Sequence, residues 1–260
     1  SGTPYLSVAT GPESAAIVRV KSDGSVEAIA LQGVGMARAE LPDPPQDELQ
    51  GPEGRRRNPR MESVTDLAFV DGQLLVSGRF GDQGRSGVQS IAYPFGEKVT
   101  LTGIEIFHAA HGRYEDNAAV RVFIPFNING EPHVLAGFTC TPLVKFPVNQ
   151  LDGSDKVRGT TVAELGNRNQ PLDMVSYEKD GRTYLLMANS TRGMMKISTD
   201  NLERTDGLED PVSGGGTAGQ EFQKVEGMDN IRQLDKLDDS RAVVIDETEG
   251  ELMLMTIPLP

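Results

Sequence analysis

One local feature of the sequence strongly limits the folds open to it: an Asp-Gly or Asn-Gly pair set between two apolar runs. The pairs are Asp71-Gly72, Asn129-Gly130 and Asp180-Gly181. A tight two-residue turn between antiparallel strands needs positive φ at both central residues, which Asn, Asp and Gly tolerate. Each pair therefore predicts a β-hairpin. Because the pairs recur about every 50 to 60 residues, they also predict a repeated structural unit.

Further apolar runs lie at matching places around each pair. In the three middle units the expected strands are 64–70, 73–78, 88–93 and 99–106; 120–126, 133–137, 143–146 and 160–165; and 172–177, 184–188, 194–197 and 221–225. Two less complete units flank them, with expected strands at 5–9 and 25–31 and at 231–234, 242–245 and 252–257. The pattern predicts a single all-β domain over residues 1–260, built from about five four-stranded antiparallel units.

This repeated pattern of apolar runs and turns resembles the blades of the broad β-propeller superfamily, and the resemblance covers nearly the whole chain. The Trp-Asp pair of WD40 blades is absent, and the sequence contains no Trp, so no subfamily is assigned. The first unit opens with what reads as a second strand, and the last ends at a third. The two incomplete units could complement each other in a closed ring, or the chain could form part of a larger ring.

Two segments lie outside the repeats. Residues 32–63 are rich in proline and too long for an ordinary connection, so we expect a functional or mobile loop. Residues 206–220 contain three consecutive glycines and no apolar periodicity, which predicts a flexible loop.

Strand order sorts the loops onto two ends of such a molecule. If the four strands of a blade run outward from the axis, the connection between the second and third strands shares one end with the connection to the next blade. His108 and His111 fall in a connection between blades, and Cys140 falls in a loop between second and third strands. We therefore expect the three side chains on the same end.

These residues form a candidate metal site. We take His108, His111, Glu115 and Cys140 as possible ligands, because imidazole and thiolate suit zinc, copper or iron. The His-Glu-x-x-His signature of zinc hydrolases is absent. Two other interpretations stay open: the histidines form hydrogen bonds within a tight loop while Cys140 is a small buried side chain, or Cys140 and a histidine form a nucleophilic pair.

A second candidate set consists of arginines and hydrogen-bonding side chains from several loops on the same end. Its members are Arg79, Arg113, Tyr114, Asn167, Arg168, Asn169, Asn189 and Arg192. The planar guanidinium group can bind a carboxylate or phosphate through two parallel hydrogen bonds. The alternative is that these arginines pair with acidic neighbours such as Asp82, Glu115, Asp116 and Glu247.

Charge and hydropathy exclude some classes of partner. The formal net charge of −13 argues against binding nucleic acid over a broad surface. No apolar run approaches 18 residues, so no membrane span is expected. The sequence starts Ser-Gly-Thr, with neither an initiator Met nor a signal peptide. We expect a processed chain whose targeting segment is out of view, in a periplasmic or secreted protein.

No motif identifies a reaction. The sequence therefore predicts a non-catalytic binding or assembly module that engages a small anionic ligand or a protein partner through one end of the propeller. The alternative is a metal-dependent propeller enzyme with its site near His108 and His111.

Overall fold

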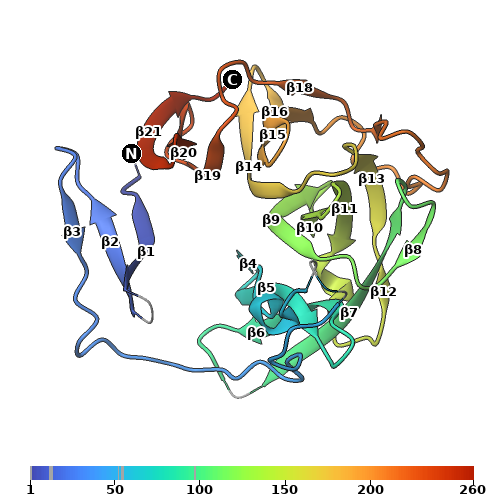
Figure 1. Cartoon of the computed structure of the whole chain (residues 1–260), viewed down its shortest axis with the longest axis horizontal. Helices are drawn as coiled ribbons and strands as arrows, with labels where there is room; N and C mark the ends of the chain where they lie inside the picture. The colour runs from blue at the N-terminus through green and yellow to red at the C-terminus, as the bar shows by residue number, and fades with distance from the viewer. Residues whose placement is uncertain (1, 12–13, 52, 54–55, 97) are drawn as a thin grey trace.

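The computed structural model describes residues 2–11, 14–51, 53, 56–96 and 98–260, and within them five small sheets form a ring (Figure 1). The first sheet contains β1 (Tyr5–Gly11), β2 (Ser14–Val20) and β3 (Val26–Ala28). The second contains β4 (Asp66–Val70), β5 (Gln73–Phe80), β6 (Arg85–Ala92) and β7 (Val99–His108), with β8 (Arg113–Glu115) and β12 (Val157–Arg158) added to β7.

The other three sheets follow in chain order. The third contains β9 (Val120–Ile128), β10 (Glu131–Phe138), β11 (Pro142–Pro147), β13 (Thr160–Glu164) and β17 (Ala218–Gly219). The fourth contains β14 (Pro171–Lys179), β15 (Arg182–Asn189), β16 (Gly193–Ser198) and β18 (Phe222–Lys224). The fifth contains β19 (Ile231–Lys236), β20 (Arg241–Thr248) and β21 (Glu251–Pro258). This arrangement is a five-bladed β-propeller, which confirms the predicted all-β class.

The three predicted hairpin turns have the expected backbone. Positive φ occurs at both residues of each pair: 50° and 73° at Asp71-Gly72, 52° and 87° at Asn129-Gly130, and 53° and 73° at Asp180-Gly181. These values place both central residues in the left-handed region that a type I′ turn requires. The same turn chemistry therefore fixes the register of the first two strands in three neighbouring blades.

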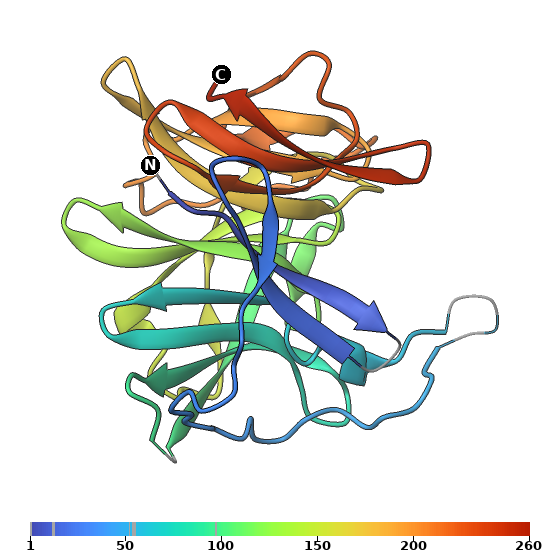
Figure 2. The ribbon, with the colours of Figure 1, turned by 90° about the vertical axis from the view of Figure 1, so that its left-hand side faces the viewer.

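The first sheet differs in detail from the sequence pattern. β2 was not expected, because its apolar residues do not alternate with polar ones: Ile17 is exposed beside the buried Val18. β3 is shorter than the expected run 25–31. Figure 2 shows this sheet in front of the other sheets, joined to the second by the long segment that precedes β4. Within residues 32–63 the structure describes a bridge between Gln50 and Arg57 and a 3-10 helix, η1 (Pro59–Glu62).

The hydrophobic core lies between neighbouring blades rather than inside any one of them. Three clusters of buried side chains fill the contacts between the second and third, third and fourth, and fourth and fifth sheets. Two carboxylates strengthen these contacts on the inner strands. Asp66 Oδ2 accepts the Phe123 amide of the next blade at 2.8 Å, and Asp173 Oδ2 accepts the Leu234 amide at 2.9 Å.

Candidate metal centre

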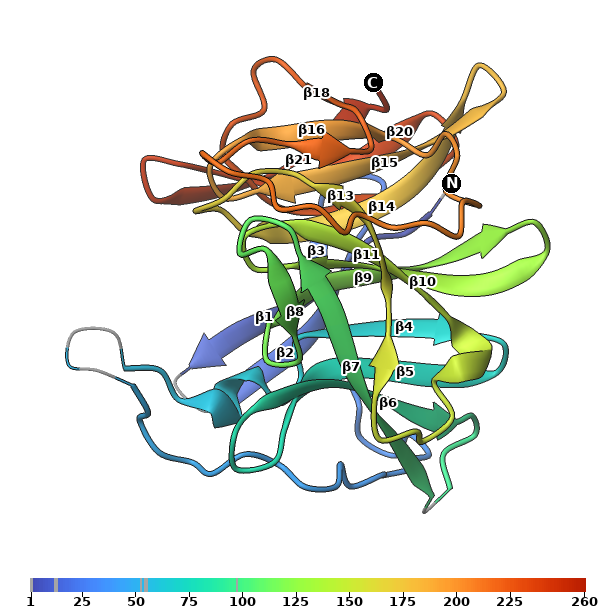
Figure 3. The same ribbon diagram turned by 90° about the vertical axis from the view of Figure 1, so that its right-hand side faces the viewer.

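His108 and His111 lie on a tight turn between β7 and β8. The amides of His111 and Gly112 both donate to the His108 carbonyl, at 3.0 and 2.9 Å, and Gly112 adopts a positive φ of 64°. The turn stacks the two imidazole rings with their centroids 3.8 Å apart. Figure 3 shows β7, β8 and β13 on the same side of the molecule.

The carboxylate of Glu115 orients both imidazole rings. Its Oε2 lies 2.8 Å from His108 Nδ1, and its Oε1 lies 2.9 Å from both His111 Nδ1 and Arg113 Nε. Burial opposes ionisation of Glu115, but the hydrogen bonds from Arg113, His108 and His111 together hold its pKa below the usual value. Because an ionised carboxylate only accepts hydrogen bonds, both Nδ1 atoms carry the proton in the neutral rings. Each Nε2 is then left with its lone pair.

His108 is buried, with 2% of its surface exposed, and its Nε2 atom has no hydrogen-bond partner among the described residues. Desolvation lowers the pKa of this imidazole, although the hydrogen bond to Glu115 opposes the shift. A neutral ring with an unused lone pair inside a protein is costly without a partner, and a bound metal ion would supply one.

Cys140 lies close to the two histidines, on the turn between β10 and β11. Cys140 and Thr141 have successive positive φ values of 63° and 57°, a conformation that side chains with a Cβ rarely adopt. Three contacts hold the turn: the Cys140 amide donates to the Asn169 carbonyl at 2.8 Å, the Thr141 amide to the Phe138 carbonyl at 2.8 Å, and Thr141 Oγ1 to the Gly166 carbonyl at 2.6 Å. Strained backbone that the surroundings hold in place is often found at functional sites.

The structure therefore brings together one ligand atom each from His108, His111 and Cys140, all within 4.8 Å of one another. Ligand atoms of tetrahedral zinc lie about 3.3 to 3.8 Å apart, given bonds of about 2.0 to 2.3 Å. A small inward movement of the exposed His111 ring and Cys140 would complete the geometry. Glu115, which we predicted as a ligand, is not in this set, because its two oxygens already bind the Nδ1 atoms.

The structure places the members of the predicted arginine set in different surroundings. Arg79 Nε pairs with Glu62 of η1 at 2.6 Å, an acid outside those we considered, and Arg113 pairs with Glu115. Tyr114 packs against Phe107 and under the guanidinium of Arg158. These side chains are used within the molecule.

The asparagines of the set form a network next to the cysteine turn. Asn189 Nδ2 donates to Asn169 Oδ1 at 2.8 Å, and Asn169 Nδ2 donates to the carbonyls of Gly166 and Asn167. The Arg192 guanidinium crosses over Gly166, where a Cβ atom would overlap it. Within the described part of the chain, no carboxylate lies at ion-pair distance from Arg168 or Arg192.

Sequence reasoning missed Glu164, the last residue of β13. Its side chain is fully buried, and its Oε2 accepts the Ala110 amide at 3.1 Å. Burial raises the pKa of Glu164 to about 7, although the amides of Ala110 and Gly166 oppose the shift. The available signal was an acidic residue inside the apolar run Val162-Ala163-Glu164-Leu165.

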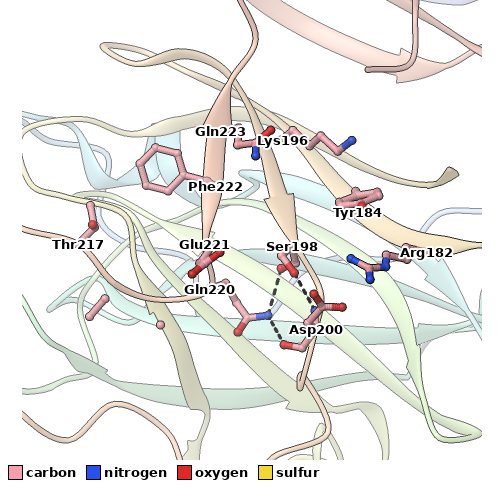
Figure 4. Close-up of a pocket in the computed structure, with 12 residues that line it drawn as sticks. Arg182, Tyr184, Lys196, Ser198, Asp200, Thr217, Gln220, Glu221, Phe222 and Gln223 are labelled. Atoms are coloured by element: carbon pink, nitrogen blue, oxygen red, sulfur yellow. Dashed lines mark hydrogen bonds between the residues drawn. The ribbon is translucent and has the colours of Figure 1, made fainter. Parts of the chain in front are cut away.

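The larger hollows lie away from the histidines. One of about 730 Å³ is at the propeller axis and is lined by inner strands of all five sheets. Another, of about 630 Å³, lies on the fourth blade (Figure 4), where Gln220 Nε2 donates to the carbonyls of Ser198 and Asp200. The ammonium of Lys196 lies 4.0 Å from the centroid of the Tyr184 ring and covers it. Neither hollow includes a residue of the candidate metal centre.

No protein-family model and no curated protein matches this chain. Among solved structures, a periplasmic gluconolactonase of Pseudomonas aeruginosa aligns with 14% identity and a TM-score of 0.41, over 100% of this chain and 68% of the gluconolactonase. In the described ranges, no helix is long and apolar enough to cross a membrane.

Proposed function

We propose that this propeller binds a transition metal ion through His108, His111 and Cys140. The observation that carries the proposal is the convergence of the three ligand atoms within 4.8 Å, with the buried Nε2 of His108 lacking any partner among the described residues. Two nitrogens and one sulfur suit zinc, copper or iron.

The surroundings of the three residues support this function. Metal-binding histidines usually donate their second ring nitrogen to a carboxylate, which fixes both tautomer and orientation, and Glu115 accepts from both rings. Cys140 would bind as the thiolate, so metal uptake would release its proton. Three protein ligands leave a fourth position for water or a small ligand, as in catalytic rather than structural zinc sites.

The test is the uptake of Co²⁺ and Zn²⁺ by the purified full chain, measured by elemental analysis after dialysis. We expect about one ion per chain, lost in His108→Ala. His133→Ala is the matched control, because His133 is also buried but bonds the Glu131 carbonyl through Nδ1, away from the cluster. Metal-free wild-type protein with an intact fold would remove the proposal, and so would equal metal loss in both variants.

A second candidate function is binding of a small anion or an acidic partner. Arg168 and Arg192 favour it, because no acidic side chain of the described residues neutralises either one. Arg168 is exposed, whereas Arg192 is half-buried, with its guanidinium 5.7 Å from the centroid of the Phe222 ring and its buried Nε without a hydrogen-bond partner among the described residues. A guanidinium without an acidic partner can bind a carboxylate or phosphate. Titration with inorganic phosphate tests it: binding should weaken in Arg192→Ala and persist in Arg79→Ala.

Location in the periplasm or outside the cell stays a prediction.

A further inference from the structure

Glu164 occupies a distinctive position between the two loops that supply the metal ligands. On one side, its Oε2 accepts the amide of Ala110, which lies between His108 and His111. On the other side, Glu164 is paired with Pro142 across β13 and β11, and the neighbouring Leu165 amide donates to the Thr141 carbonyl at 3.1 Å. Thr141 directly follows Cys140. The one residue therefore connects the histidine turn with the cysteine turn.

Only one of the two carboxyl oxygens of Glu164 has a hydrogen-bond partner among the described residues. No part of its surface is exposed, and the Gly166 amide is near enough to lower its pKa, yet its Oε1 atom has no hydrogen-bond partner among the described residues. Asp173 provides the contrast, because its Oδ1 accepts the Met174 amide and its Oδ2 the Leu234 amide, both at 2.9 Å. A carboxyl group that served only the fold would be expected to use both oxygens, as Asp173 does.

We propose that Glu164 is a positioning residue that fixes the separation between the histidine pair and Cys140. This inference rests on the proposed metal-binding function. Glu164 contacts the backbone of the histidine turn rather than the ligand atoms, so it acts through Ala110. The side chain of Glu164 holds the histidine turn, while its backbone belongs to the strand that pairs beside the cysteine turn. Glu164 thereby sets the distance between the imidazole nitrogens and the thiol, and this distance decides how well a small ion fits.

The chemistry of the contact indicates which replacement is tolerated. The bond from Ala110 needs only an acceptor oxygen at the end of a side chain of this length, which glutamine also provides. Burial raises the pKa of Glu164 to about 7, so the neutral form is well populated near neutral pH. Glutamine should therefore preserve the position of the histidine turn, whereas alanine should release it.

The experiment compares Co²⁺ binding by the wild-type chain, Glu164→Gln, Glu164→Ala and the control Asp173→Ala, with affinity and visible absorption spectrum as readouts. We expect Glu164→Ala to weaken Co²⁺ binding by about 10- to 100-fold, the usual effect of losing an outer partner, and to alter the spectrum. Glu164→Gln should keep both near the wild-type values. Asp173→Ala should lower the melting temperature without changing the spectrum.

Two results would overturn the inference while leaving the proposed function intact: wild-type affinity and spectrum in Glu164→Ala, or an equal loss of affinity in Asp173→Ala. Absence of Co²⁺ binding in the wild-type chain would instead remove the proposed function and this inference with it. If the alanine variant does not fold, Glu164→Asp replaces it. Aspartate keeps the acid but withdraws the oxygen from Ala110 by one methylene, so binding should weaken; unchanged binding would contradict the inference.

Discussion

Glu115 Oε2 lies 2.8 Å from His108 Nδ1, and this contact decides which nitrogen of the buried imidazole is free. Because the carboxylate accepts the Nδ1 proton, the lone pair belongs to Nε2, an atom buried without a partner in the described part of the chain. The same carboxylate holds His111, so a single side chain prepares both nitrogen ligands.

Replacing Glu115 with alanine should weaken metal binding by about 10- to 100-fold without abolishing it, because the ligands remain but their orientation is lost. Isothermal titration with Zn²⁺ measures the change. Arg113→Ala is the matched control, since it removes another neighbour of Glu115 but leaves both contacts to the histidine rings. Equal affinities in wild type and Glu115→Ala would show that the carboxylate has no part in the site.

The stability of the metal-free protein should carry a pH dependence from Glu164. Its pKa is about 7 in the folded chain and about 4.3 when unfolded, so the folded state holds more protons between these values. The stabilisation from this group is complete below about pH 4 and is lost as the pH rises through about 7.

Glu164→Gln removes this ionisable group, so the variant does not lose stability as the group deprotonates. The free energy of unfolding of Glu164→Gln minus that of wild type should therefore increase between pH 5 and pH 8, by on the order of 1–3 kcal/mol. Urea denaturation at the two pH values measures the difference. A constant difference between the two proteins would contradict the assignment.

Replacing Asp173 with alanine should lower the stability of the fold without changing metal binding. Its carboxylate ties the fourth blade to the fifth through Leu234, and alanine would leave two amides without their acceptor. Loss of buried hydrogen bonds of this kind costs about 1–3 kcal/mol each. Thermal unfolding should show a clearly lower melting temperature. An unchanged melting temperature would mean that the contact between blades contributes nothing.

Gly166→Ala should disturb the turn beside Cys140. The residue has a positive φ of 96°, and a Cβ atom there would overlap the Arg192 guanidinium. We expect destabilisation of about 1–3 kcal/mol from backbone strain, together with displacement of Arg192. Gly181→Ala is a useful comparison, because it has a similar positive φ but open space around it. If Gly166→Ala is no worse than Gly181→Ala, the overlap has no energetic consequence.

Much of the fold could be predicted because its determinants are local. Asp71, Asn129 and Asp180 each precede a glycine, and this pair sets the turn whatever the distant surroundings. The order of the strands within a blade also predicted that His108, His111 and Cys140 lie at the same end of the molecule. What the sequence did not reveal depends on contacts between distant segments.

Three residues illustrate this limit. Glu62 lies in the proline-rich segment, and nothing local indicates that Arg79 pairs with it across 17 residues. Glu115 looked like a ligand from its neighbourhood, but both oxygens are used by the histidines. Glu164 was hidden inside an apolar run, since its significance comes from Ala110, which lies 54 residues away in the sequence.

X-ray absorption spectroscopy of the Co²⁺-loaded full chain tests the central claim most directly, because it reports the atoms bound to the metal. The account predicts one sulfur and two imidazole nitrogens in the first coordination sphere, with the sulfur lost in Cys140→Ser. A sphere of oxygen atoms alone, unchanged by Cys140→Ser and by His108→Ala, would contradict it.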